Sequence, residues 1–125
     1  MLKLLYIGLG GFLGSILRYI TSKYLNQLMS GFPLGTLVVN VSGSFALGFL
    51  LYSVSFGKNI SSDTRDFIAI GFIGAFTTMS TFAYESFRLL ELNEWMFFAL
   101  NLFFNIILCL LAVYAGKELS LMLFK

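Results

Sequence analysis

Four long apolar runs, separated by short polar stretches, dominate the pattern of the chain. The runs extend over about residues 4–25, 34–56, 67–90 and 95–124. A helix that crosses a membrane needs about 20 mostly apolar residues, and each run reaches that length. The pattern therefore predicts an all-α membrane protein with four transmembrane helices. We expect a single domain over residues 1–125, because no connection is long enough to hold another.

Local signals mark the ends of several of these runs. Pro33 comes directly before the second run, and proline is favourable in the first turn of a helix. Trp95 opens the fourth run and is expected to anchor it at the membrane interface. The polar segment 57–66 is predicted to connect the second and third helices. The first run also resembles a signal peptide, but three more runs follow it and no A-x-A-like cleavage site closes it.

The composition agrees with lipid as the main solvent of this chain. Hydrophobic residues make up 58% of the 125 residues and charged residues only 11%, whereas soluble domains carry about 25% charged residues. The net charge of +2, without a basic cluster or an RNA-binding motif, gives no indication of a nucleic-acid partner. There is no histidine and no recognisable nucleophile–base pair, so we expect no enzyme.

The basic residues bear on the orientation of the chain in the membrane. Four helices place both termini on one side, which divides the basic residues five against three: Lys3, Lys58, Arg65, Lys117 and Lys125 against Arg18, Lys23 and Arg88. Under the positive-inside rule so small a difference is a weak signal. It fits insertion in both orientations, and it equally fits insertion in one orientation with a small bias.

Three asparagines lie within the apolar runs. Asn40 is in the second run, and Asn101 and Asn105 in the fourth run share one helix face that Cys109 continues. An amide without a hydrogen-bond partner in hydrocarbon costs about several kcal/mol, the free energy of moving such a group from water into an apolar environment. These side chains therefore either join helices or line a hydrated path, and their number favours the path.

The third run carries the strongest signal. Residues 71–82 read GFIGAFTTMSTF, with the hydroxyls of Thr77, Thr78, Ser80 and Thr81 close together after two glycines. Glycine and threonine are weak helix formers, so a break within about residues 74–80, at mid-membrane depth, is expected. Broken backbone at that depth survives where it is buried in protein or lines a wet cavity, and its carbonyls can coordinate Na⁺. The alternative is an intact helix whose hydroxyls donate to their own backbone.

The polar residues limit what such a path would carry. The candidate lining lacks a ring of carboxylates, which would favour cations. Its amide and hydroxyl hydrogens and its aromatic ring edges suit a small anion or a neutral polar solute. Arg18 and Glu85 are functional candidates as ionisable groups within the spans, although either could simply lie at an interface. Four helices enclose a pore poorly, so we expect an oligomer with the path at a subunit interface.

Three segments in order resemble the Fluc (CrcB) family of fluoride channels, and the resemblance covers nearly the whole chain. Residues 10–19 read GGFLGSILRY, similar to the family's GGxxGxxxRY. Residues 35–43 read GTLVVNVSG, similar to GTLxxNxxG. Residues 71–82 are similar to GFxGxxTTFSTF. Together these motifs are far more specific than any one of them.

The resemblance implies an antiparallel, dual-topology homodimer in the cell membrane, with two pores along its interface. It implies passive fluoride export and a structural, non-transported Na⁺ held by the backbone carbonyls of Gly74 and Thr77. Asn40 and Phe82 match pore positions, and Arg18 matches a vestibule arginine. Further polar positions near the pore match Thr36, Ser80, Thr81 and Glu85.

The sequence departs from the family at two places. Met79 stands where the first pore phenylalanine usually lies, and a thioether is flexible but has no ring edge. Asn101, Asn105 and Cys109 occupy a face where the family often has tyrosine, serine and small residues. We include Met79, Asn101 and Asn105 among the pore-lining candidates.

Two other classes of membrane protein compete with a channel. A small multidrug exporter also has four helices, but it needs an acidic residue in the membrane to exchange protons for drugs, and Glu85 is the sole candidate. A non-conducting assembly subunit would use its polar residues to join helices.

Overall fold

The computed structural model describes all residues, 1–125, and is entirely helical. Its elements in chain order are α1 (Leu2–Asn26), α2 (Leu34–Ser55), α3 (Ser62–Asp66), η1 (Phe67–Ile73), α4 (Gly74–Phe76), α5 (Met79–Glu91) and α6 (Trp95–Phe124). The elements α3 to α5 follow one another and form a single long span, Ser62–Glu91. Four spans are long and apolar enough to cross a membrane, which confirms the predicted all-α architecture.

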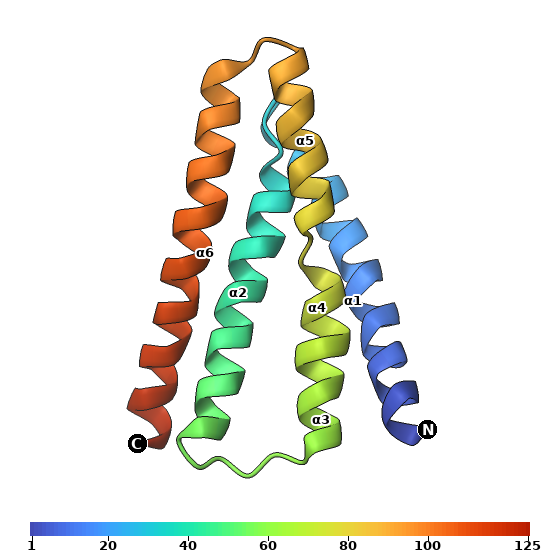
Figure 1. Ribbon diagram of the computed structural model, residues 1–125, viewed down its shortest axis with the longest axis vertical. Coiled ribbons are helices and arrows are strands. Elements are labelled where there is room, and N and C mark those ends of the chain that lie inside the picture. Colours follow the sequence, from blue (N-terminus) through green and yellow to red (C-terminus); the bar gives the residue numbers. More distant parts are fainter.

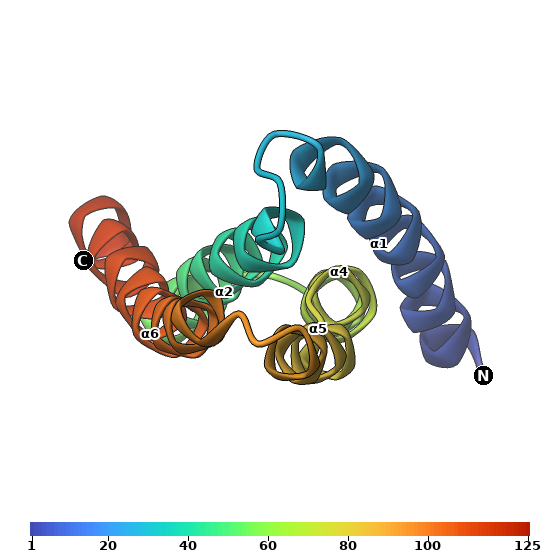
Figure 2. The same ribbon diagram turned by 90° about the horizontal axis from the view of Figure 1, so that it is seen from above.

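The four spans run up and down beside one another, so that both termini lie at the same end of the molecule (Figure 1). Seen along the spans, α2 lies between α1 and α6, and the third span lies to one side of α2 (Figure 2). Helices α2 and α6 pack closely because glycines face the partner backbone. A Cβ added to Gly48 would lie 2.6 Å from the carbonyl oxygen of Val113.

The third span begins five residues before the predicted start at Phe67. The prediction followed the apolar run, whereas the helix starts in the polar segment with Ser62. Ser61 caps this start, because its hydroxyl accepts a hydrogen bond of 3.2 Å from the backbone N–H of Thr64. Hydrophobicity locates the part of a helix that lies in lipid, so it misses a polar first turn.

Within this span η1 is a π-helical segment that lies directly against α1. Glycines make the contact backbone to backbone: a Cβ added to Gly71 would lie 2.5 Å from the carbonyl oxygen of Ile7. A Cβ on Gly10 or Gly14 would collide with the carbonyl oxygen of Phe67 or Phe72. These glycines therefore fix the distance between α1 and the third span.

Polar side chains are buried inside the bundle together with apolar ones, while large apolar side chains also cover the outside, as expected in lipid. Fully or almost fully buried side chains include Thr36, Ser53, Asn101 and Ser120. Large apolar side chains are exposed along all four spans, among them Phe12, Ile70, Phe103 and Met122. Each buried polar side-chain atom has a hydrogen-bond partner, so the interior is fully paired.

Candidate functional site

The third span is not helical at Thr77 and Thr78. Thr77 has φ −84° and ψ 158°, and Thr78 has φ −151° and ψ 121°, both of which are extended conformations. The hydroxyl of Thr78 accepts a hydrogen bond of 3.2 Å from the N–H of Thr81 and so caps the start of α5. Two threonines thus separate α4 from α5, within the range 74–80 that the weak helix formers indicate.

The interruption leaves backbone carbonyls without their helical partners. In a continuous helix the N–H of Thr78 would donate to Gly74, and the N–H of Thr81 to Thr77. Instead, the N–H of Thr78 donates to Oδ1 of Asn40 at 2.8 Å, and that of Thr81 donates to the Thr78 hydroxyl. The carbonyl oxygens of Gly74 and Thr77 accept no hydrogen bond. Carbonyl oxygens that accept no hydrogen bond are suitable ligands for Na⁺.

Arg18 donates a hydrogen bond to another backbone carbonyl of α4, next to that of Gly74. Its Nε donates a hydrogen bond of 2.9 Å to the carbonyl oxygen of Ala75, across the contact between α1 and α4. The guanidinium therefore supports the interrupted backbone as well as facing a cavity. The sequence pattern identified Arg18 but gave no indication of this backbone partner.

Asn40 on α2 fixes the extended segment through both ends of its amide. Its Nδ2 donates to the carbonyl oxygen of Thr78 and to Oδ1 of Asn105, each at 3.1 Å. Its Oδ1 accepts from the N–H of Thr78. The side chain thus replaces two of the backbone bonds that the interruption removes.

The hydrogen bonds continue from Asn40 into α6 and α5. Nδ2 of Asn105 donates to Oδ1 of Asn101 at 3.0 Å, and Nδ2 of Asn101 donates to the hydroxyl of Ser86 at 2.9 Å. Ser86 in turn donates to the carbonyl oxygen of Phe82 at 2.7 Å. Sequence reasoning missed Ser86, although its position four residues after Phe82 places it on the same face of α5.

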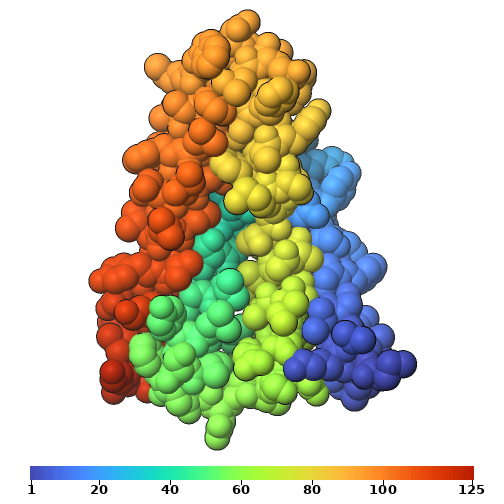
Figure 3. Space-filling model, in the orientation of Figure 1, coloured from blue at the N-terminus to red at the C-terminus, as the bar shows by residue number.

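Two cavities lie on either side of the interruption. The first has a volume of about 460 Å³ and is lined by α2, the third span and α6, with Asn40, Gly74, Thr77, Met79, Phe82, Asn105 and Cys109 among its residues. It lies on the face shown in Figure 3, where α2 is recessed between α6 and the third span. The second, of about 400 Å³, is polar and includes Arg18, Lys23, Thr36, Thr81 and Glu85. Thr78 lines both cavities.

The other candidate residues from the sequence differ in whether they line one of the two cavities. The hydroxyl of Thr36 donates to the carboxylate of Glu85, which joins α2 to α5 in the second cavity. Met79 is 75% exposed beside the first cavity, whereas Phe82 is buried. Asn101 is fully buried and lines neither cavity, and Ser80 is exposed and lines neither. In the single chain these two residues are therefore the least connected with a path.

Known proteins resemble the chain along nearly its whole length. Residues 5–117 match the family described as CrcB-like protein, Camphor Resistance (CrcB). The chain is 50% identical over 121 residues to a fluoride-specific ion channel FluC of Methanococcus maripaludis, covering 97% of this chain and 98% of the relative. It is 47% identical over 117 residues to fluoride-specific ion channel FluC 1 of Methanosarcina acetivorans, covering 94% and 89%. It is 46% identical over 125 residues to a FluC of Methanococcus aeolicus, covering 100% of both.

These matches confirm the resemblance that the three sequence motifs indicate. They agree with the four apolar spans, so the chain is a multi-pass protein of the cell membrane. The family match extends over residues 5–117. Relatives that the chain covers almost completely are 46–50% identical to it. The chain belongs to the CrcB family.

Proposed function

We propose that the chain is a fluoride-specific ion channel that passively exports F⁻ across the cell membrane and so lowers cytoplasmic fluoride. The observation that carries the proposal is the interruption at Thr77 and Thr78, which Asn40 holds between two cavities. Relatives named as fluoride-specific ion channels, with 46–50% identity over nearly the whole chain, support the choice of ion.

A second copy of the chain completes the pathway in this proposal. Both cavities are open to the outside of the single chain, and Met79 beside the first is 75% exposed. An antiparallel partner seated on this face would close the first cavity and repeat it by symmetry, which gives two pores. The division of the basic residues, five at one end of the bundle against three at the other, is compatible with the insertion in both orientations that this pair requires.

The pathway would exchange the water shell of the anion for hydrogen bonds from the protein. Arg18 and Lys23 outnumber Glu85 among the charged residues that line the second cavity. The hydroxyl of Thr81 accepts from Thr78 and keeps its own hydrogen for the anion, whereas the hydroxyl of Thr36 donates to Glu85. Both hydrogens of the Asn40 amide are used in the structure, by Thr78 and Asn105. Fluoride that passes this point must therefore replace at least one of these two hydrogen bonds.

A structural Na⁺ fits the interruption. The unpartnered carbonyl oxygens of Gly74 and Thr77 are neutral, hard donors, and both residues line the first cavity. In an antiparallel pair the same two carbonyls of the partner would complete the ligand set. The bound ion supplies a fixed positive charge that stabilises the freed carbonyls, and it is not transported.

Fluoride efflux from proteoliposomes tests the function. We expect the purified protein, with Na⁺ present, to release loaded fluoride and to retain chloride. Asn40→Leu should reduce fluoride efflux by about tenfold or more, because it removes the amide and leaves Thr78 and Asn105 without partners. Ser42→Ala on the same helix is the matched control, because Ser42 bonds only to its own helix. Absence of fluoride efflux from the unchanged protein would refute the proposal.

The same preparation separates the two competing classes. Proton release on addition of a cationic drug, abolished by Glu85→Gln, would favour a proton-coupled exporter. Unchanged fluoride efflux in Asn40→Leu would mean that the amides only join helices, as in an assembly subunit, and would refute the assignment of Asn40 to the pore.

A further inference from the structure

Three lysines lie over aromatic rings at the end of the molecule that holds both termini. Nζ of Lys58 lies 4.4 Å from the ring centre of Phe124. Nζ of Lys117 lies 5.5 Å from that of Tyr52, and Nζ of Lys125 lies 5.5 Å from that of Phe56. We call these three lysines and three rings the lysine–aromatic patch. The C-terminal ends of α2 and α6, which are adjacent in Figure 1, supply it.

The rings beneath the charges lie in two pairs. The ring centres of Tyr52 and Phe56 are 6.1 Å apart, and Phe124 lies 6.1 Å from Phe49 of α2. A cation over an aromatic face is attracted by the negative charge of that face. The contacts therefore restrict three long side chains that would otherwise move independently.

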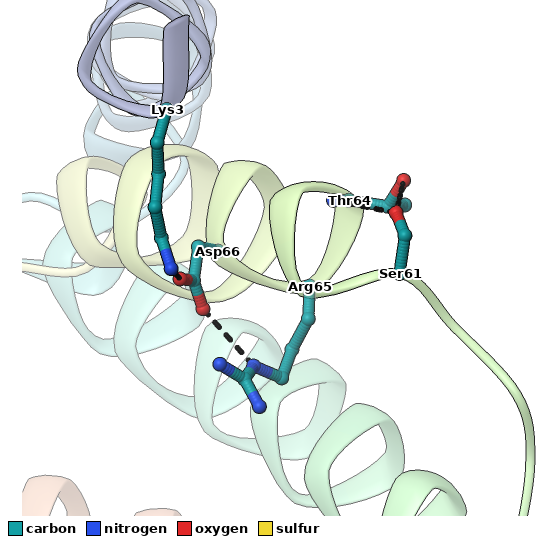
Figure 4. Close-up of polar contacts among 5 residues, drawn as sticks. All are labelled: Lys3, Ser61, Thr64, Arg65 and Asp66. Carbon is teal, nitrogen blue, oxygen red and sulfur yellow. Dashed lines mark hydrogen bonds and ion pairs between the residues drawn. The ribbon is translucent and has the colours of Figure 1, made fainter. Parts of the chain in front are cut away.

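The positive charges of the patch have no acidic partner. None of its lysines lies within 4.0 Å of a carboxylate, because the ion pairs of the structure involve other residues. Lys3 at the same end gives the contrast: its Nζ lies 2.7 Å from Asp66, which also accepts from Arg65 at 3.0 Å (Figure 4). The three lysines of the patch thus have no ion-pair partner, whereas Lys3 at the same end is paired with a carboxylate.

The position of the patch determines what can reach it. It lies where α2 and α6 end, and lysine and aromatic side chains at the ends of membrane spans lie at the depth of the lipid headgroups. The adjacent surface of α6 exposes Leu119, Met122 and Leu123, which would contact an acyl chain. Charge and apolar surface together suit an amphiphile with a negative head.

We propose that the lysine–aromatic patch binds the headgroup phosphate of an anionic membrane lipid. The ammonium groups of Lys58, Lys117 and Lys125 surround the phosphate, and the acyl chains lie along the end of α6. The proposal goes beyond fluoride conduction and does not depend on it. If the protein inserts in both orientations, one patch of each homodimer faces each leaflet.

Lipid retention measured by native mass spectrometry tests the site in the full chain. We expect phosphatidylglycerol to be retained in preference to phosphatidylcholine with the same acyl chains. Each substitution in Lys58→Gln, Lys117→Gln and Lys125→Gln should weaken retention of phosphatidylglycerol by about fivefold. Lys3→Gln is the matched control, because it removes one charge at the same end and should leave retention unchanged.

Several outcomes would overturn the site. Equal retention by the triple lysine variant and the unchanged protein would exclude these lysines. An equal loss in Lys3→Gln would mean that net charge alone attracts the lipid. Inorganic phosphate that displaces phosphatidylglycerol at equal concentration would mean that the acyl chains contribute nothing. The double variant Tyr52→Leu, Phe124→Leu keeps all three lysines, and unchanged retention there would refute the role of the rings.

Discussion

At the scale of single residues, the geometry separates amides that the sequence treats alike. Asn40 and Asn105 line the first cavity, while Asn101 is fully buried and bonds to Ser86 and Asn105. From the sequence all three are pore-lining candidates, because an amide in an apolar run needs a partner and three such amides favour a hydrated path over joints between helices. Which partner it finds depends on neighbours that are distant in the chain, so the sequence alone could not distinguish a path from a structural network.

Met79 is the residue where this chain departs most visibly from the family pattern. We expect Met79→Phe to preserve or raise fluoride efflux, because the side chain is exposed beside the first cavity and a ring edge would offer a partly positive surface to the anion. Met96→Phe, on an exposed position of α6 that lines neither cavity, is the control. Loss of efflux in Met79→Phe alone would mean that the site is adapted to methionine.

At the scale of elements, glycine decides how the third span packs. The spacing of the glycines in the first apolar run is typical of close helix packing, but the structure identifies which of them are in contact. Gly10 and Gly14 lie against the third span, whereas a Cβ on Gly8 would meet nothing within 4 Å.

Gly14→Ala should therefore destabilise the protein by about 1–3 kcal/mol, because the new methyl group would collide with the carbonyl of Phe72 and α1 would have to move. Thermal unfolding in detergent measures the effect. Gly8→Ala on the same helix should not lower the unfolding temperature, because the added methyl group meets no neighbouring atom and alanine favours the helix. Equal unfolding temperatures for the two variants would contradict the packing described here.

The third span also shows where sequence patterns lose precision. Weak helix formers indicated an interruption within residues 74–80, and the extended residues are Thr77 and Thr78. The position depends on Asn40, whose amide replaces the missing backbone bonds from another helix. A local propensity cannot include a hydrogen bond between residues 38 positions apart.

At the scale of the whole molecule, two features bear on how two copies assemble: both cavities open to the outside of the single chain, and the basic residues at the two ends of the bundle differ little in number. We expect dual topology, which single cysteines in a Cys109→Ser background can detect. Asn59→Cys and Ser30→Cys lie in exposed connections at opposite ends of the bundle. Both should be labelled in part by an impermeant maleimide on intact cells, and fully after permeabilisation. Labelling of only one of the two would contradict insertion in both orientations.

By itself the sequence determined the solvent, the helices and the family of this protein. Length and apolarity of four runs suffice for the first two, because lipid requires every span to satisfy its own backbone bonds. Three local motifs suffice for the family. Only the tertiary structure decided which carbonyls are left unpaired, which amide holds the extended segment, and which aromatic rings three scattered lysines lie over. Those features depend on contacts between different helices, which no periodicity along one chain contains.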